Sequence, residues 1–166
     1  MKRAVIFGLL LLVLPATLGA QAPAARPNPA VQAADPILGT WELNAAKSSF
    51  KLSPPLKSET RTFTQAGDEI KVTSTVVTLD GKTEKSAWTL AYDGKDRPLT
   101  GSDDVDALSV TRTDPYHATA VNKKNGKVVR TLTRVISPDG KTMTFTEKGT
   151  NAKGESVTDV VVFEKK

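Results

Sequence analysis

The sequence predicts an all-β domain, an antiparallel up-and-down β-barrel of about 8–10 strands. Three observations favour it. Dipeptides typical of tight turns recur at mostly even intervals along the chain. Threonine and valine dominate the segments between them, as they do on pleated surfaces. Apolar residues rarely recur three and four positions apart, so few segments have the pattern of an amphipathic helix. A β-sandwich is the alternative layout for the same strands.

Residues 1–20 have the order of parts found in a secretory signal peptide. Two basic residues, Lys2 and Arg3, precede an uninterrupted apolar run that ends at Leu14, and small residues follow it. The run is well short of the ~20 residues that cross a bilayer as a helix, so we expect removal after Ala20 rather than anchoring. The sequence therefore predicts an exported protein, either periplasmic or secreted.

The composition predicts one domain after a linker. Residues 21–35 are rich in Ala, Pro and Gln and have almost nothing to bury, which predicts a disordered linker, and residues 36–166 form the domain. The absence of cysteine excludes disulfides, thiol catalysis and thiolate metal sites. Removing residues 1–20 takes away two positive charges and lowers the formal net charge from +5 to +3. Since the remaining lysines and arginines are spread along the chain, we expect neither a nucleic-acid partner nor stable membrane insertion.

The predicted strands follow from the turns. The first is GTWEL, residues 39–43, and Pro54-Pro55 argues against a helix in the long connection 44–58. Every later turn joins neighbouring segments, whereas a sandwich usually needs long crossing connections, so the closed barrel is favoured. The turn signals are Gly67-Asp68, Asp80-Gly81, Asp93-Gly94, Gly101-Ser102, Asp114-Pro115, Asn125-Gly126, Asp139-Gly140 and residues 151–154.

Alternation along each strand separates two faces. One face carries the bulkiest apolar residues and four arginines, and the other carries mostly threonine. We expect the first face to line the barrel interior and the threonines to face solvent. The predicted ligand-binding residues on the inner face are Arg61, Trp88, Leu90, Tyr92, Arg112, Arg130, Arg134, Met143, Phe145 and Phe163.

The four inward arginines have two interpretations, because a buried cation needs a carboxylate, water or an anionic ligand group. In the first, they bind the acidic head of an apolar molecule whose tail contacts the aromatic side chains. In the second, which is favoured because arginine is common in strands, they reach solvent at the barrel rim or pair with carboxylates. The candidate carboxylates are Glu59, Glu84, Glu147 and Asp159.

The motif Gly39-Thr40-Trp41 resembles the GxW signature that opens lipocalins and the related fatty-acid-binding proteins. The hairpin meander and the closing residues 162–165 are similar to that superfamily too, so the resemblance covers about residues 36–166. It implies a barrel in which Gly39 and Trp41 lie at the floor, with the tryptophan packed across it. It also implies a small hydrophobic or amphipathic ligand.

Three further segments resemble small exported bacterial proteins described only as lipocalin-like, a group of uncharacterised function. These segments are residues 39–44, 92–98 and 137–144. Two features depart from the fatty-acid-binding branch. Residues 44–58 are too short and too rich in proline for its pair of mouth helices. Its carboxylate-binding Arg and Tyr on the last strand correspond to Val161 and Phe163, so an anion would have to be bound by the other arginines.

No pattern for catalysis, a cofactor or a metal emerges, and we do not expect an enzyme. His117 lacks a nucleophile beside it, and one histidine without cysteine does not build an ordinary transition-metal site. The acidic run Ser102 to Asp106 lacks the spacing of a calcium loop. Two functions remain: an exported barrel that binds a small hydrophobic or amphipathic ligand, or a closed barrel without ligand that acts as an envelope or protein-interaction module.

Overall fold

A computed structural model describes residues 34–151 and 153–166. The predicted signal peptide and nearly all of the predicted linker lie outside this part of the chain. The elements, in order, are β1 (Gly39–Leu43), the 3-10 helix η1 (Ala45–Lys47), β2 (Leu56–Ala66), β3 (Glu69–Thr78), β4 (Thr83–Leu90), β5 (Arg97–Pro98), β6 (Ala107–Arg112), β7 (His117–Lys124), β8 (Lys127–Ile136), β9 (Thr142–Thr150) and β10 (Ser156–Lys165).

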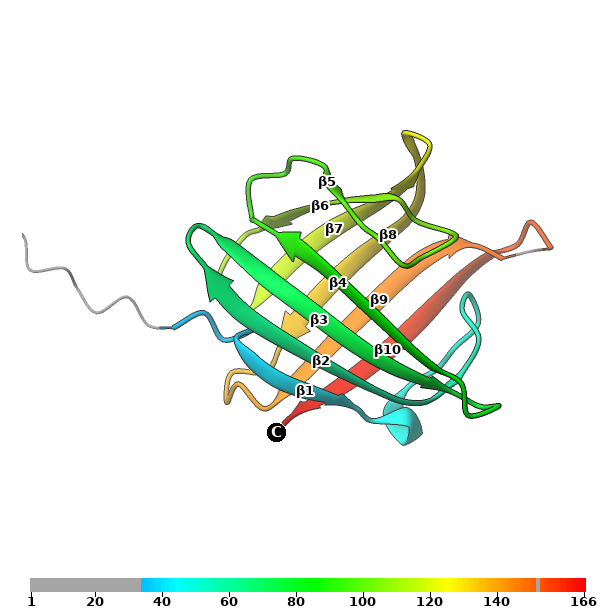
Figure 1. Ribbon diagram of the computed structural model, residues 1–166, viewed down its shortest axis with the longest axis horizontal. Helices are drawn as coiled ribbons and strands as arrows, with labels where there is room; N and C mark the ends of the chain where they lie inside the picture. Colours follow the sequence, from blue (N-terminus) through cyan, green and yellow to red (C-terminus); the bar gives the residue numbers. More distant parts are fainter. Residues whose placement is uncertain (1–33, 152) are drawn as a thin grey trace, which may run out of the picture. The chain divides into compact units, whose positions relative to one another are not determined.

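The ten strands form one antiparallel sheet in the order β4-β3-β2-β1-β10-β9-β8-β7-β6-β5. This single sheet curls into a barrel (Figure 1), which confirms the predicted up-and-down barrel and excludes the two stacked sheets of a sandwich. β1 pairs with β10 at the register Trp41 to Lys165, so the beginning and the end of the domain lie side by side. Within the described residues, no helix is long and apolar enough to cross a membrane.

Each of the predicted turns separates two strands. The β7–β8 hairpin shows most clearly why such a dipeptide forms a turn, since Asn125 and Gly126 have φ angles of 50° and 74°. Positive φ at both central residues defines the two-residue turn whose twist matches the twist of antiparallel strands, and Asn-Gly adopts it at low cost. Local sequence thus sets where each strand ends.

The barrel is nearly, not fully, closed. β4 meets Leu99, the residue after β5, through an isolated bridge from Trp88. The Thr100 hydroxyl adds a 3.4 Å hydrogen bond to the Ala87 carbonyl. We call this region, where β4 faces residues 99–101, the seam. Because it lacks a continuous ladder, the seam is the most weakly bonded stretch of the wall.

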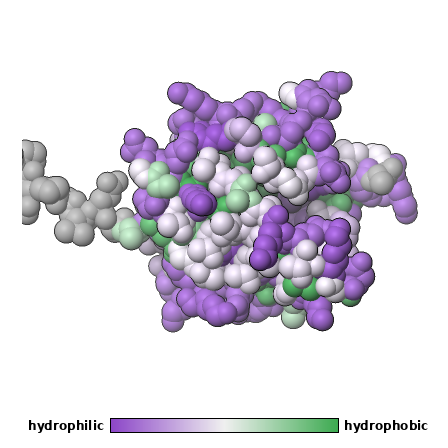
Figure 2. All heavy atoms as spheres, in the orientation of Figure 1, coloured by the Kyte–Doolittle hydropathy of each residue, from purple (hydrophilic) through white to green (hydrophobic). Residues whose placement is uncertain are grey.

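The two faces of the strands are divided as the alternation predicts. In β8, Arg134 and Ile136 are buried, while Thr131 and Thr133 are exposed. Val128 is an exception, since it shares the predicted inner face but is 58% exposed. The pairing of β7 with β8 shifts at this end of the strand, and such a bulge interrupts the alternation. The face in Figure 2 is mostly hydrophilic to intermediate, with small apolar areas.

Candidate functional site

The barrel encloses an interior cavity of about 560 Å³. This volume lies in the usual range of small-molecule sites, roughly 300–1,000 Å³. Its apolar lining comes from opposite walls, for example Trp88 and Leu90 of β4 and Phe145 of β9. Phe50, Ser53 and other residues outside the strands cover the end at which β1 ends and β2 begins. We call this end the mouth.

The opposite end is closed by Trp41, which is fully buried in the core. Its indole Nε1 donates a 2.7 Å hydrogen bond to the Ile37 carbonyl, and the Lys165 Nζ lies 5.1 Å from the ring centroid. Gly39 has a φ of 114°, and a Cβ there would lie 3.1 Å from Lys165 Cε. Glycine therefore allows both the backbone conformation and the close approach of the last strand beside the tryptophan.

Arg134 is the unusual charge of the cavity wall. Its side chain is buried, with 5% of the residue exposed, and it lines the cavity. Its Nη1 donates a 3.0 Å hydrogen bond to the Tyr92 hydroxyl. Its Nε and Nη2 have no hydrogen-bond partner among the described residues. A buried guanidinium without a carboxylate is costly, so this position is suited to an anionic group from outside the chain.

Tyr92 completes this local arrangement. Burial raises the pKa of its hydroxyl, although the nearby Arg134 cation acts in the opposite direction. The phenol therefore keeps its proton at neutral pH. Since its oxygen already accepts a hydrogen bond from Arg134, its own O–H is available to donate to the same anionic group.

Arg61 also faces the cavity, but it is paired with the carboxylate of Glu59. Its Nε donates to Glu59 Oε1 at 2.5 Å, and the same oxygen accepts a 2.7 Å hydrogen bond from Ser74. The guanidinium carbon lies 5.8 Å from the Trp88 ring and 5.3 Å from the Phe145 ring, within the range of cation–π contacts. This cation is therefore already balanced inside the barrel.

Arg130 is also paired, nearer the mouth. Its Nη1 lies 3.4 Å from Glu147 Oε1, and its Nη2 lies 3.2 Å from Asp104 Oδ2. Burial raises the pKa of Glu147, and Arg130 lowers it in part. These contacts leave Arg130 less suited than Arg134 to an incoming anion.

Two comparisons with solved structures bear on the fold. A fatty-acid-binding protein of Schistosoma mansoni, solved in complex with arachidonic acid, matches with a TM-score of 0.53 and 16% identity over 79% of this chain and 96% of that one. The Rv2717c protein of M. tuberculosis matches with a TM-score of 0.52 and 17% identity over 84% of this chain and 98% of that one. At this identity the likeness shows the fold alone, a single-sheet β-barrel. No protein-family model and no curated protein sequence matches the chain.

The barrel brings together six of the predicted ligand-binding residues. The cavity lining includes Arg61, Trp88, Leu90, Arg130, Arg134 and Phe145. Met143 and Phe163 are fully buried in the core cluster with Trp41, outside the cavity lining. Tyr92 is outside the cavity lining and contacts it through the hydrogen bond that its hydroxyl accepts from Arg134. Arg112 lies apart from the cavity, where it pairs with Asp35 and stacks 4.2 Å from the Tyr92 ring centroid.

Of the four candidate carboxylates, two pair with arginines of the inner face and two do not. Glu59 and Glu147 pair with arginines, as the second interpretation proposes, whereas Glu84 forms a 2.9 Å pair with Lys82. Asp159 is fully buried and binds backbone amides instead of an arginine.

The cavity is also lined by apolar residues that are not among the predicted ligand-binding residues. The alternation of side chains along the strands places some of them, such as Leu108, on the inner face. No sequence pattern marks the lining residues that lie outside the strands. The additional lining residues of both kinds include Ile37, Phe50, Pro54, Leu99, Val105, Leu108, Val110 and Leu132.

The remaining polar candidates lie on the surface. His117 is exposed, and its Nδ1 lies 2.9 Å from an Asp114 carboxylate oxygen. Its hydrogen bond is the main reason that the pKa of Asp114 is lowered. Among residues 34–151 and 153–166, no group of three or more His, Asp or Glu side chains is arranged to hold a metal ion.

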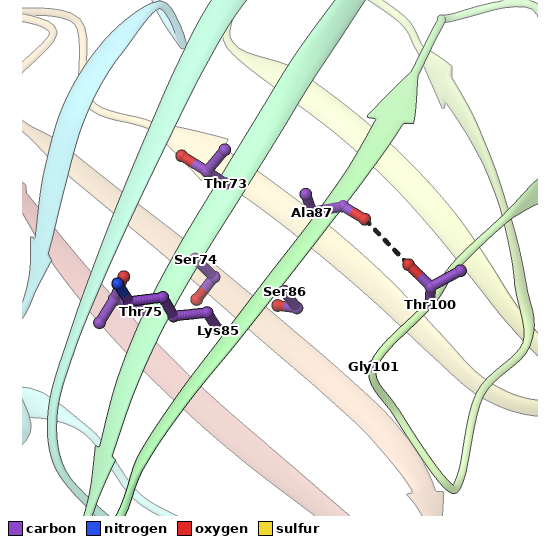
Figure 3. A pocket seen from close by; sticks show the side chains of 8 residues that line it. All are labelled: Thr73, Ser74, Thr75, Lys85, Ser86, Ala87, Thr100 and Gly101. Carbon is purple, nitrogen blue, oxygen red and sulfur yellow. Dashed lines mark hydrogen bonds between the residues drawn. The ribbon is translucent and has the colours of Figure 1, made fainter.

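A second, smaller hollow of about 330 Å³ lies over β3, β4 and the seam (Figure 3). Its lining is made of serine and threonine side chains together with Lys85, Ala87 and Gly101. Ser74, Ser86 and Gly101 line both this hollow and the cavity, so the wall of the barrel is thin at this point.

Proposed function

We propose that this barrel binds a small amphipathic molecule with one anionic group in its interior cavity. The observation that carries the proposal is the buried Arg134 guanidinium, which lines a 560 Å³ cavity without a carboxylate partner in the described chain. A barrel that acts only through its surface needs neither such a void nor such a charge. The cavity therefore favours ligand binding over the envelope or interaction module.

The charges of the cavity support a single anion rather than several. Arg61 and Arg130 each have a glutamate partner, so Arg134 is the cation left to balance. We place the anionic group against Arg134 and the Tyr92 hydroxyl. The apolar part of the ligand then extends past Trp88 and Phe145 toward the mouth.

The comparison with known structures supports the ligand class. A protein of the same fold, at 16% identity, was solved with arachidonic acid, which combines one carboxylate with an apolar chain. The mode of binding proposed here is different from the Arg and Tyr pair that the resemblance implies for the last strand. Val161 and Phe163 occupy those positions, so Arg134 of β8 takes the role.

Paired ligands of equal chain length test the proposal. We expect the protein to bind decanoate and oleate more tightly than decanol and oleyl alcohol in calorimetric titrations. Arg134→Met removes the hydrogen bonds to the charged group, worth roughly 1.5–3 kcal/mol, and should therefore abolish the preference for the acid. The control Lys71→Met removes an exposed cation of β3 that lies outside the cavity and should keep this preference. Equal affinity of the wild type for acids and alcohols would contradict the anionic site, and no binding of either would contradict the function.

We further propose that the protein is exported, on the basis of the signal-peptide pattern of residues 1–20. Intact-mass spectrometry of the protein from fractionated bacterial cells tests this. The expected result is a periplasmic or secreted species that begins at Gln21. A full-length chain confined to the cytoplasm would contradict it.

A further inference from the structure

The connection between η1 and β2 covers the mouth of the barrel. Its residues 50–54, which we call the strap, belong to no strand. Phe50, Ser53 and Pro54 of the strap line the cavity. The strap thus lies where fatty-acid-binding proteins, which the sequence resembles, have a pair of helices over the mouth. The strap is far shorter than such a pair.

One buried side chain holds the strap. Asp159 of β10 is fully buried and lines the cavity. Its Oδ1 accepts hydrogen bonds from the backbone N–H groups of Lys51 and Leu52, the latter at 2.6 Å. Its Oδ2 accepts a 3.0 Å hydrogen bond from the N–H of Ser53. Hydrogen bonds to an ionised carboxylate are about twice as strong as neutral ones, so three of them fix the centre of the strap.

The other contacts of the strap are weaker. The Arg130 Nη1 lies 3.5 Å from the Ser53 hydroxyl, at the limit of a hydrogen bond. Leu52 packs over Gly149, where a Cβ would lie 3.0 Å from Leu52 Cδ2. Opening the strap is costly, since it would leave the Asp159 carboxylate as a buried charge without hydrogen-bond partners. Opening the strap therefore breaks mainly one set of bonds.

We propose that the strap is a gate over the ligand cavity and that Asp159 is the clasp that holds it shut. The ligand enters and leaves when the three N–H bonds to Asp159 break together. Asp159 is a positioning residue, because it acts on the ligand through the strap. This inference rests on the proposed function for the identity of the ligand, but the clasp itself can be observed on the empty protein.

The wild-type protein tests the clasp by amide hydrogen exchange. The N–H groups of residues 51–53 should exchange at least about tenfold more slowly than free peptide, as expected for bonds to a charged acceptor, although they lie outside every strand. Exchange at the free-peptide rate would overturn the clasp whether or not any ligand binds.

Stopped-flow binding of 8-anilinonaphthalene-1-sulfonate, a fluorescent amphipathic anion, tests the gate. In the wild type, the observed rate should level off as the probe concentration rises, because strap opening becomes limiting. A rate that increases linearly throughout the accessible range would overturn the gate. Absence of any fluorescence change would contradict the proposed function instead and leave the exchange experiment to decide the clasp.

Asp159→Asn separates gating from simple destabilisation. We expect faster exchange at residues 51–53 and association and dissociation rates of the probe that both rise at least about tenfold, with a nearly unchanged dissociation constant. The matched control Asp103→Asn changes an exposed carboxyl near the mouth and should leave all rates unchanged. Weaker equilibrium binding of the Asp159 variant with an unchanged association rate would indicate a structural role and overturn the gate. If the variant does not fold, the two wild-type measurements still decide.

Discussion

Arg134 shows how a single side chain links the architecture to the proposed ligand. Alternation in the sequence predicts its inward direction, because it shares a face with Leu132 and Ile136. The sequence could not predict which of the four arginines lacks a carboxylate. That depends on contacts between residues far apart in the sequence, such as those of Arg130 with Asp104 and Glu147.

Replacing Arg134 by methionine should stabilise the empty protein. An unpaired buried guanidinium costs free energy, and a similar apolar side chain removes the cost, so we expect the unfolding free energy to rise by about 1–4 kcal/mol. Urea denaturation measures it. Lys71→Met, at an exposed position of β3, should change it by less than about 0.5 kcal/mol. A destabilised Arg134 variant would mean that the guanidinium is satisfied in solution by some other group.

Trp41 should be among the most important side chains for stability. It is fully buried against Ile37 and Phe163, so Trp41→Ala should cost roughly 3–5 kcal/mol of unfolding free energy. The matched Trp88→Ala should cost less, because Trp88 borders the cavity and loses fewer contacts. Thermal or urea denaturation gives the comparison. A cost below about 1 kcal/mol for Trp41→Ala would show that the indole does not close the floor.

The turns are the elements that local sequence determines most directly. Dipeptides such as Asn125-Gly126 specify both the turn and the register of the strands beside it. The strap carries no comparable signal. Its conformation depends on Asp159, more than a hundred positions away, and on the absence of helix-forming pattern around Pro54. Sequence therefore predicts the strands and turns well but leaves the covering of the mouth undetermined.

Gly126→Ala tests the turn of the β7–β8 hairpin. A Cβ at Gly126 would meet nothing within 4 Å, so its cost is purely conformational. We expect a loss of about 1–2 kcal/mol, because an L-residue at φ 74° is strained. Gly126→Asn should lose less, since asparagine tolerates this region. Equal losses for the two variants in chemical denaturation would argue against the left-handed conformation.

For the whole barrel, closure depends on side chains as well as on strand pairing. Arg97 of β5 donates a 2.9 Å hydrogen bond to Glu69 of β3 and a 2.7 Å hydrogen bond to Asp93. The contact with Glu69 links β5 to β3 beside the end of β4, near the seam, where the ladder is interrupted. The even spacing of the turns predicts a closed sheet. It does not predict where the closure is weakest, because the spacing does not reveal that β5 is only two residues long.

The Asp93 carboxyl makes this closure sensitive to acid. Its hydrogen bond with Arg97 is the main reason that its pKa is lowered from 3.8 to about 2. The folded form therefore binds fewer protons than the unfolded form, so this contribution to stability is complete above about pH 4 and is lost as the pH falls through 2.

Asp93→Asn should consequently lower the melting temperature at pH 6, and the difference from the wild type should disappear near pH 2. Melting curves across this range measure the difference. Asp68→Asn, which changes an exposed carboxyl in the β2–β3 turn, serves as the control and should show no such convergence. A difference that is constant from pH 6 to pH 2 would contradict the role of the Arg97 contact.

The pairing of β1 with β10 has a consequence for how the chain acquires its structure. β1 supplies the tryptophan of the floor, yet one of its two hydrogen-bonded neighbours is made of the last residues of the domain, Ser156–Lys165. A ribosome-bound chain that has not yet released those residues can form hairpins but has no means of completing the cylinder. The barrel can therefore close only after β10 has left the ribosome.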